Sequence, residues 1–348
     1  MGPPRLATVV GVTVIETQGL TKRYGSVQAP ALADLTIEVG DGVTGLVGAN
    51  GAGKSTLIKL LLGLLAPTSG SATVLGHDIG RAGEQIRRAV GYMPEHDCLP
   101  PDMRCIDFVV HMGRMSGLPP APARERAADV LRHVGLAEER YRLMGGYSTG
   151  MKQRAKLAQA LVHDPELVML DEPTNGLDPA ARDDMLALVQ RIGHDFGIPV
   201  LVTSHLLGEL ERISDHVVVL DGGQLLRLEA TRTFLADTGT VLVEVTGEGD
   251  AQRRMGEALA ARGLTCRPQG SLIEIDPLTV DGPSSGGDPA AAADGQDAGS
   301  PEEDAAAAAH DRLRDLVRDT AADLDLGLVR IQARTGRLED VFRDEVPA

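Results

Sequence analysis

A nine-residue stretch early in the chain constrains its fold more than any other feature. Residues Gly48 to Thr56 read G-A-N-G-A-G-K-S-T and fit the phosphate-binding pattern G-x-x-x-x-G-K-[ST]. The apolar run Val43–Val47 before it predicts a short buried strand, and the run Leu57–Leu65 after it predicts a helix. Such a turn points backbone N–H groups and the positive end of a helix dipole at an oxyanion. We therefore predict an α/β domain that binds a phosphorylated ligand.

Individual side chains of this stretch have separate expected roles. Lys54 is placed to reach the outer phosphates, and Ser55 is placed to hold a magnesium ion. A glycine-rich turn without a ligand is the alternative, but it does not explain the Lys-Ser pair after the last glycine. The remaining residues expected to surround the phosphates are Gly48, Asn50, Gly51, Ala52, Gly53 and Thr56.

Two carboxylates follow a second apolar run. The segment Leu167–Leu170 predicts a buried parallel strand, and Asp171 and Glu172 come directly after it. In phosphate-loop NTPases an aspartate at this place holds magnesium together with the loop serine. The next carboxylate is able to polarise an attacking water. His205 follows another apolar run, Pro199–Ser204, and is either a structural hydrogen-bonding group or part of the same site.

Two further positions each have two interpretations. Tyr24 precedes a turn, where its ring either packs half-buried or stacks on a base. Glu95 comes just past a strand that ends at Pro94. Ligands collect at strand ends in α/β sheets, so Glu95 is either a ligand contact or an exposed loop carboxylate.

A third candidate is a helix start in the stretch Tyr147–Arg154. Ser148 or Thr149 is a suitable N-cap for the helix that follows. With Gly150 allowing close approach, this start is able to face a second phosphate. A capped helix without a ligand is the alternative.

A change in sequence pattern and composition along the chain indicates two domains. Residues 12–236 predict the nucleotide-binding domain, with a helical subdomain at about residues 101–163. Residues 237–348 predict a small α+β domain. Within it, residues 277–304 are rich in Pro, Gly, Ala and Ser and carry acidic residues without Lys or Arg. This composition predicts a disordered insertion.

Composition excludes other classes of protein. The 348 residues contain 34 Lys and Arg against 50 Asp and Glu, a formal net charge of -16, which argues against nucleic acid or anionic lipid as a partner. No apolar run approaches the about 18 residues of a membrane span, so any membrane role is expected to come through a partner. The three scattered cysteines form no disulfide framework and indicate a reducing compartment.

Together these motifs resemble the nucleotide-binding subunit of an ATP-binding cassette (ABC) transporter over about residues 12–236. Gly48–Thr56 is similar to the family's Walker A motif and Leu167–Asp171 to its Walker B motif. Tyr147–Met151 occupies the place of the signature motif, and Gly176–Asp178 is similar to the D-loop. The resemblance implies a mixed-sheet phosphate-loop NTPase that hydrolyses ATP with Mg²⁺.

The resemblance also implies roles for single residues. Glu172 is the family's catalytic carboxylate, His205 is its switch histidine at the γ-phosphate, and Tyr24 stacks on adenine. Two departures from the family pattern stand out. Thr149 and Met151 replace a glycine and the glutamine of the signature.

The second departure concerns the Q-loop, where Glu95 stands in place of glutamine. A carboxylate here is still able to contact magnesium or its water. It also adds negative charge near the γ-phosphate.

Partners follow from the same resemblance. A single phosphate loop implies that two copies pair head to tail, each placing Ser148, Thr149 and Gly150 against ATP held by the other. A separate integral-membrane permease is expected, with this chain cytoplasmic and peripheral on the inner face of the membrane. The tail Leu338–Phe342, L-E-D-V-F, resembles type-2 exporter ATPases, including those of drug resistance.

The alternative is a soluble, non-transport ABC ATPase that acts on ribosomes or nucleic acid. Such proteins usually carry two cassettes or a long coiled-coil insertion, and the sequence shows neither.

Overall fold

The computed structural model describes residues 13–25, 29–234, 237–247, 250–276 and 301–335. It divides after Phe234 into two compact units, which are described separately. Among these residues every helix is too short or too polar to cross a bilayer. The three cysteines are free thiols.

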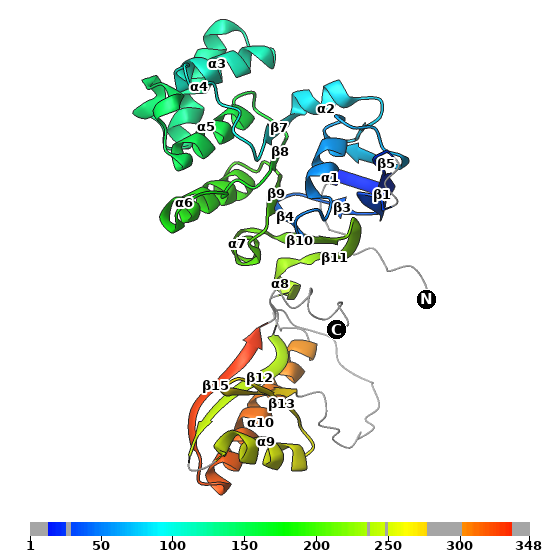
Figure 1. Cartoon of the computed structure of the whole chain (residues 1–348), viewed down its shortest axis with the longest axis vertical. Coiled ribbons are helices and arrows are strands. Elements are labelled where there is room, and N and C mark those ends of the chain that lie inside the picture. Colours follow the sequence, from blue (N-terminus) through cyan, green and yellow to red (C-terminus); the bar gives the residue numbers. More distant parts are fainter. Residues whose placement is uncertain (1–12, 26–28, 235–236, 248–249, 277–300, 336–348) are drawn as a thin grey trace, which may run out of the picture. The chain divides into compact units, whose positions relative to one another are not determined.

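The first unit is organised around a six-stranded sheet (Figure 1). All neighbouring strands are parallel except the last two, which form an antiparallel hairpin. The strands of the parallel part are short, apolar and buried on both faces, as expected for a sheet covered by helices. In spatial order they are β7 (Val90–Met93), β8 (Leu167–Leu170), β9 (Val200–Ser204), β4 (Val43–Val47), β10 (His216–Asp221) and β11 (Gln224–Ala230).

A second, antiparallel sheet lies beside the first, and helix α1 (Lys54–Leu61) is sandwiched between them (Figure 1). The helix buries Leu57, Ile58, Leu60 and Leu61 in the core shared by both sheets, which is why its apolar residues are not confined to one stripe. The antiparallel strands are β2 (Leu32–Leu35), β1 (Ile15–Lys22), β5 (Ser69–Val74) and β6 (His77–Asp78), with β3 (Glu38–Val39) also paired to β1.

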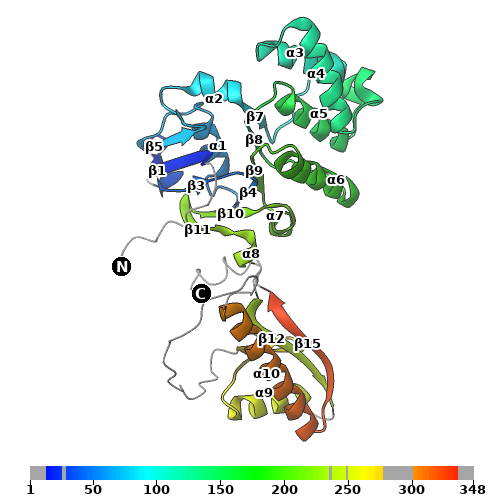
Figure 2. The ribbon, with the colours of Figure 1, turned by 180° about the vertical axis from the view of Figure 1, so that it is seen from behind.

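Three helices form a layer of their own, apart from the strands in both views (Figures 1 and 2). They are α3 (Cys105–Met115), α4 (Pro120–His133) and α5 (Thr149–Leu161), with short 3-10 turns at Glu139–Tyr141 and Met144–Gly146. Helix α5 also packs against β7 and so connects this layer to the sheet.

The remaining helices of this unit cover the sheet or connect its strands. Helices α6 (Pro179–Gln190) and α7 (Leu207–Ile213) lie on the face opposite α1 (Figure 1). Asp178 caps α6 through the N–H of Ala181, and α6 continues as a π-helical turn over Arg191–Asp195. Helix α2 (Gly83–Ala89) precedes β7, and α8 (Thr231–Phe234) ends the unit.

The second unit is a four-stranded antiparallel sheet with two helices. Helices α9 (Ala251–Ala261) and α10 (Pro301–Asp323) contribute Met255, Leu259, Leu313 and Val317 to a core with the buried residues of the central strands. In order the strands are β13 (Thr265–Gln269), β14 (Leu272–Asp276), β12 (Asp237–Thr246) and β15 (Gly327–Thr335).

Some element boundaries differ from the sequence-based expectation. Strand β13 is not among the expected elements. It contains Pro268 and lies at the sheet edge, where proline is tolerated. The part of the expected insertion at residues 301–304 belongs to α10, and Pro301 suits the first turn of a helix. Residues 277–300 and the tail motif 338–342 lie outside the described residues.

The fold class agrees with the expectation. The first unit is a phosphate-loop α/β cassette with a mixed sheet and a helical subdomain, and the second unit is a small α+β fold.

Candidate functional site

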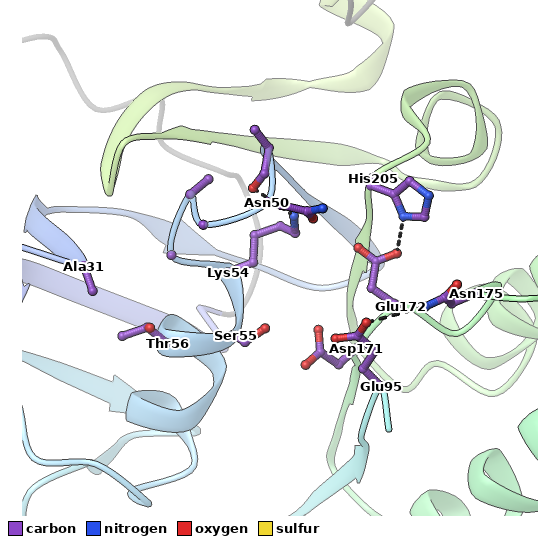
Figure 3. Close-up of a pocket in the computed structure, with 14 residues that line it drawn as sticks. Ala31, Asn50, Lys54, Ser55, Thr56, Glu95, Asp171, Glu172, Asn175 and His205 are labelled. Atoms are coloured by element: carbon purple, nitrogen blue, oxygen red, sulfur yellow. Dashed lines mark hydrogen bonds and ion pairs between the residues drawn. The ribbon is translucent and has the colours of Figure 1, made fainter. Parts of the chain in front are cut away.

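A cavity of about 290 Å³ lies where β4 ends and α1 begins. The carboxyl ends of β7, β8 and β9 face the same space, as parallel strand order requires. Figure 3 shows the acidic side chains across this space from Lys54 and Ser55. The cavity is lined by Ala31, Ala49, Asn50, Gly51, Ala52, Gly53, Lys54, Ser55, Thr56, Glu95, Asp171, Glu172, Asn175 and His205.

The loop between β4 and α1 needs glycine at two of these positions. Gly51 and Gly53 have φ values of 87° and 102°, a left-handed region that costs little only for glycine. A Cβ at Gly53 would lie 2.5 Å from the carbonyl oxygen of Ala31. The backbone N–H groups at the start of α1 are thereby brought to the cavity without side chains in the way.

Lys54 is buried and folds back over this loop. Its Nζ donates to the carbonyl oxygen of Gly48 at 2.6 Å, and its side chain lines the cavity. Gly48 itself does not line the cavity. A Cβ there would meet the carbonyl oxygen of Leu220 at 2.5 Å, so the residue is a close-packing position.

The two carboxylates after β8 differ in surroundings. Asp171 is 4 % exposed, and its Oδ1 accepts a hydrogen bond from Thr203 Oγ1 at 2.9 Å. Burial raises the pKa of Asp171, while the hydrogen bonds from Thr203 and Ser55 and the charge of Lys54 oppose that rise. Glu95 adds to the rise through its own negative charge.

Glu172 has an uncommon backbone conformation. Its φ is 51°, a left-handed value that costs a non-glycine residue roughly 1–2 kcal/mol. Its N–H donates to Thr203 Oγ1 at 2.9 Å, which holds this conformation. Its Oε2 lies 2.7 Å from His205 Nδ1, and the pair is drawn as a dashed line in Figure 3. Backbone strain of this kind is concentrated at functional sites.

Tyr92 in β7 is half-buried and interacts with Asp171. Burial first, and then the Asp171 carboxylate, raise the pKa of Tyr92 to about 12. The phenol therefore stays protonated at neutral pH, and it is able to donate a hydrogen bond to Asp171.

Several residues of the site were not predicted from the sequence. Asn175 lines the cavity, and its Nδ2 donates to Glu95 Oε1 at 3.5 Å. Ala31 also lines the cavity, and Thr203 bridges the two carboxylates. The position of Thr203 near the end of a buried strand is the only sequence signal that these three offered.

Other predicted site residues lie outside this cavity. Tyr24 is 43 % exposed, and Lys22 Nζ lies 5.4 Å from the centroid of its ring. Ser148 is the N-cap of α5 and accepts from the N–H of Met151 at 3.3 Å, which decides between the two cap candidates. Thr149 and Gly150 form the first turn of α5, and the cavity does not include them.

Comparison with known proteins identifies relatives of this arrangement. A sequence profile of the ABC transporter family matches residues 32–175. The daunorubicin/doxorubicin resistance ATP-binding protein DrrA of Streptomyces peucetius is 37 % identical over 250 residues, which cover 72 % of this chain and 75 % of that protein. The bacitracin transport ATP-binding protein BcrA of Bacillus licheniformis is 38 % identical, covering 62 % and 69 %. A Nod factor export ATP-binding protein I of Cupriavidus pinatubonensis is 35 % identical, covering 71 % and 75 %.

Solved structures agree in fold. A post-hydrolysis dimer of an ATP-binding cassette with ADP and Pi has a TM-score of 0.58 at 22 % identity, covering 63 % of this chain and 99 % of that one. An ATP-binding subunit of an ABC transporter has a TM-score of 0.56 at 30 % identity, covering 64 % and 92 %. The sequence relatives, which are named for drug resistance, transport and export, favour a transporter subunit over a ribosome- or nucleic-acid-directed ABC ATPase. The chain belongs to the ABC transporter family, as an ATP-binding subunit that hydrolyses ATP.

Proposed function

We propose that two copies of this chain pair around two ATP molecules and drive a separate membrane permease that exports its substrate. The observation that carries the proposal is the convergence of Lys54, Ser55, Asp171, Glu172 and His205 on one cavity. A phosphate loop, a buried aspartate and an ordered carboxylate–histidine pair are the parts that phosphoryl transfer to water requires.

The donor set fits magnesium. Ser55 offers a hydroxyl oxygen and Asp171 a carboxylate oxygen, and Glu95 lies within the same cavity. Mg²⁺ prefers such oxygen ligands and usually keeps several waters. Burial disfavours the charge on Asp171, which a bound cation would offset. Ser55 and Asp171 would hold the ion, and water and phosphate oxygens would supply its remaining ligands.

Each side chain then has a defined task. Gly51 to Thr56 bind the phosphates through N–H groups, with Lys54 adding charge. Glu172 orients or deprotonates the attacking water. His205 Nδ1 is bonded to Glu172, which leaves Nε2 for the γ-phosphate. A doubly protonated ring is able to donate to both at once.

The second copy supplies the other wall of the site. The start of α5 is exposed at Ser148 and Thr149, whereas Gly150 is half-buried, and a Cβ there would lie 3.5 Å from Ala181 Cβ of the same chain. Its N–H groups and dipole suit the γ-phosphate of ATP held by the partner. Tyr24 is exposed enough to stack on adenine. ATP then joins the phosphate-binding loop of one copy to the start of α5 of the other, and hydrolysis breaks this contact.

The transport assignment extends from the relatives' names. They are named for daunorubicin and doxorubicin resistance, bacitracin transport and Nod factor export. We infer an export permease as the partner of this chain, which places the chain on the cytoplasmic face of the membrane. The exported compound is selected by the permease.

The test is the variant Glu172→Gln. It should keep ATP affinity, lower kcat by about 10²–10⁴-fold as expected for loss of a general base, and accumulate as an ATP-bound dimer in sedimentation velocity. Exposed Glu125→Gln on α4 serves as the control and should behave as wild type. Near-normal turnover in Glu172→Gln would assign the base elsewhere, and a monomer under all ATP conditions would contradict the pairing.

A further inference from the structure

A buried lysine on α5 has no task in the function proposed above. Lys156 is 3 % exposed. Its Nζ donates to the carbonyl oxygens of Pro94 at 2.8 Å, Glu95 at 2.9 Å and His96 at 3.5 Å. An ammonium group has three N–H donors, so each is matched to one carbonyl of this loop. The loop is the one that carries Glu95 into the cavity.

The same face of α5 holds a second loop of the cavity. Gln153 is 5 % exposed and lies one turn before Lys156. Its Nε2 donates to the carbonyl oxygen of Asn175 at 3.0 Å. The Asn175 side chain in turn reaches Glu95 Oε1 at 3.5 Å (Figure 3). Helix α5 thus fixes both loops from behind, and its first turn begins at Thr149 after the Ser148 cap.

Besides its hydrogen bonds, the positive charge of Lys156 suits its position. Burial lowers the pKa of Lys156, while the nearby carboxylates of Asp97, Glu95 and Asp171 oppose that change. A buried ammonium is costly unless it is hydrogen-bonded and faces opposite charge. Here it has both, and two of those carboxylates, Glu95 and Asp171, line the cavity.

We propose that Lys156 is a positioning residue for ATP hydrolysis, which fixes the loop of Glu95 and offsets the negative charge that Glu95 brings beside Asp171. The inference rests on the proposed function, because it takes Glu95 to contact the magnesium–ATP complex. Lys156 does not touch the substrate and acts through Glu95. Without its charge, the acidic side of the cavity repels the triphosphate more strongly.

The test is a double-mutant cycle on the full chain. Wild type, Lys156→Met, Glu95→Gln and the double variant are compared by steady-state ATPase assays that give kcat and KM for magnesium–ATP. Lys156→Met should lower kcat about tenfold and raise KM. In the Glu95→Gln background, where the extra charge is gone, the same change should cost about threefold or less. Equal losses in both backgrounds would overturn the inference, because a purely structural role does not depend on the charge at position 95.

Lys152→Met is the matched control. Lys152 is on the same helix and reaches the same loop through a 2.8 Å ion pair with Asp97, but its side chain is 35 % exposed. Surface pairs of this kind contribute little, so kcat should stay within about twofold of wild type. A loss as large as that of Lys156→Met would overturn the inference in favour of a general charge effect.

Effects on folding are separated from effects on function by one further measurement and one further variant. Thermal unfolding of each variant reports stability, and if Lys156→Met does not fold, the cycle is run with Lys156→Gln, which keeps an amide donor without the charge. If the wild type is active and the change at Lys156 costs the same in both backgrounds, only the role proposed for Lys156 is overturned. A wild type without magnesium-dependent turnover would contradict the proposed function and this inference with it.

Discussion

At the scale of single residues, the hydroxyl of Thr203 joins the two acids of the site. It donates to Asp171 Oδ1 and accepts from the N–H of Glu172, both at 2.9 Å, in a fully buried position. One hydroxyl therefore fixes the orientation of one carboxylate and the left-handed backbone of the other. The geometry of both carboxylates therefore depends on Thr203.

Thr203→Val should remove both hydrogen bonds without changing the shape of the core. A hydrogen bond to a charged group contributes about 1.5–3 kcal/mol, so we expect kcat to fall roughly ten- to a hundredfold. ATP affinity without magnesium, measured by calorimetry, should change little, because the phosphate loop is untouched. Wild-type kcat in a folded variant would contradict the positioning role of Thr203.

Lys54→Ala should weaken ATP binding strongly. Among the described residues, Lys54 is the only lysine that lines the cavity, and its Nζ lies over the phosphate-binding loop, 2.6 Å from the carbonyl oxygen of Gly48. Loss of a charged contact to phosphate at this depth should weaken affinity about a hundredfold. Isothermal titration calorimetry measures this directly, with exposed Lys59→Ala on the same helix as the control. Unchanged affinity would show that Lys54 does not reach the nucleotide.

At the scale of elements, two regions of α5 take part in the proposed function. Its N-terminus is capped by Ser148 and exposed, whereas its middle holds the loops of Glu95 and Asn175 through Lys156 and Gln153. A rigid helix couples these two places because its own hydrogen bonds resist bending. Movement of the helical layer would therefore shift the loops of Glu95 and Asn175 in the cavity of the same chain.

Ser148→Arg tests the exposed end of this helix. A large cation there should block the approach of a second copy, so ATP binding should persist while ATP-dependent dimers and turnover are lost. Sedimentation velocity with a hydrolysis-deficient partner variant measures the pairing. Ser116→Arg, an equal change at the exposed end of α3, is the control. Full turnover in Ser148→Arg would favour a phosphate-loop enzyme that works without this helix start.

At the scale of the whole molecule, the cavity and the second unit are separate in sequence. Among the described residues, all that line the cavity lie between Ala31 and His205, whereas the second unit follows Phe234 and has a core of its own. The two units are therefore expected to divide nucleotide chemistry from another task.

Replacing residues 280–300 by a short Gly-Ser linker should leave ATPase activity within about twofold of wild type. The segment lies between β14 and α10 in the sequence and contains, apart from Val280 and two prolines, only polar, small and acidic residues. Such a composition contributes little to a core. Steady-state ATPase assays and thermal unfolding check both expectations. A marked loss of activity would show that the segment acts on the catalytic unit.

The sequence by itself determined the elements and the chemistry. Gly48–Thr56, Asp171–Glu172 and His205 were identified because their spacing relative to apolar runs places them at strand ends. Hydrophobic periodicity and cap residues are local properties, so most helices and strands could be predicted within a few residues. Strand β13 was missed, and it contains Pro268, which its place at the sheet edge permits.

Only the tertiary structure decided which side chains share the cavity and what holds them. Asn175, Thr203 and Lys156 act through partners about 30 to 80 residues away, and no periodic pattern records such contacts. Their roles depend on strand order and on the approach of α5 to β7, which arise when separate segments pack into one core. Local sequence fixes which groups are available, and packing fixes which of them meet.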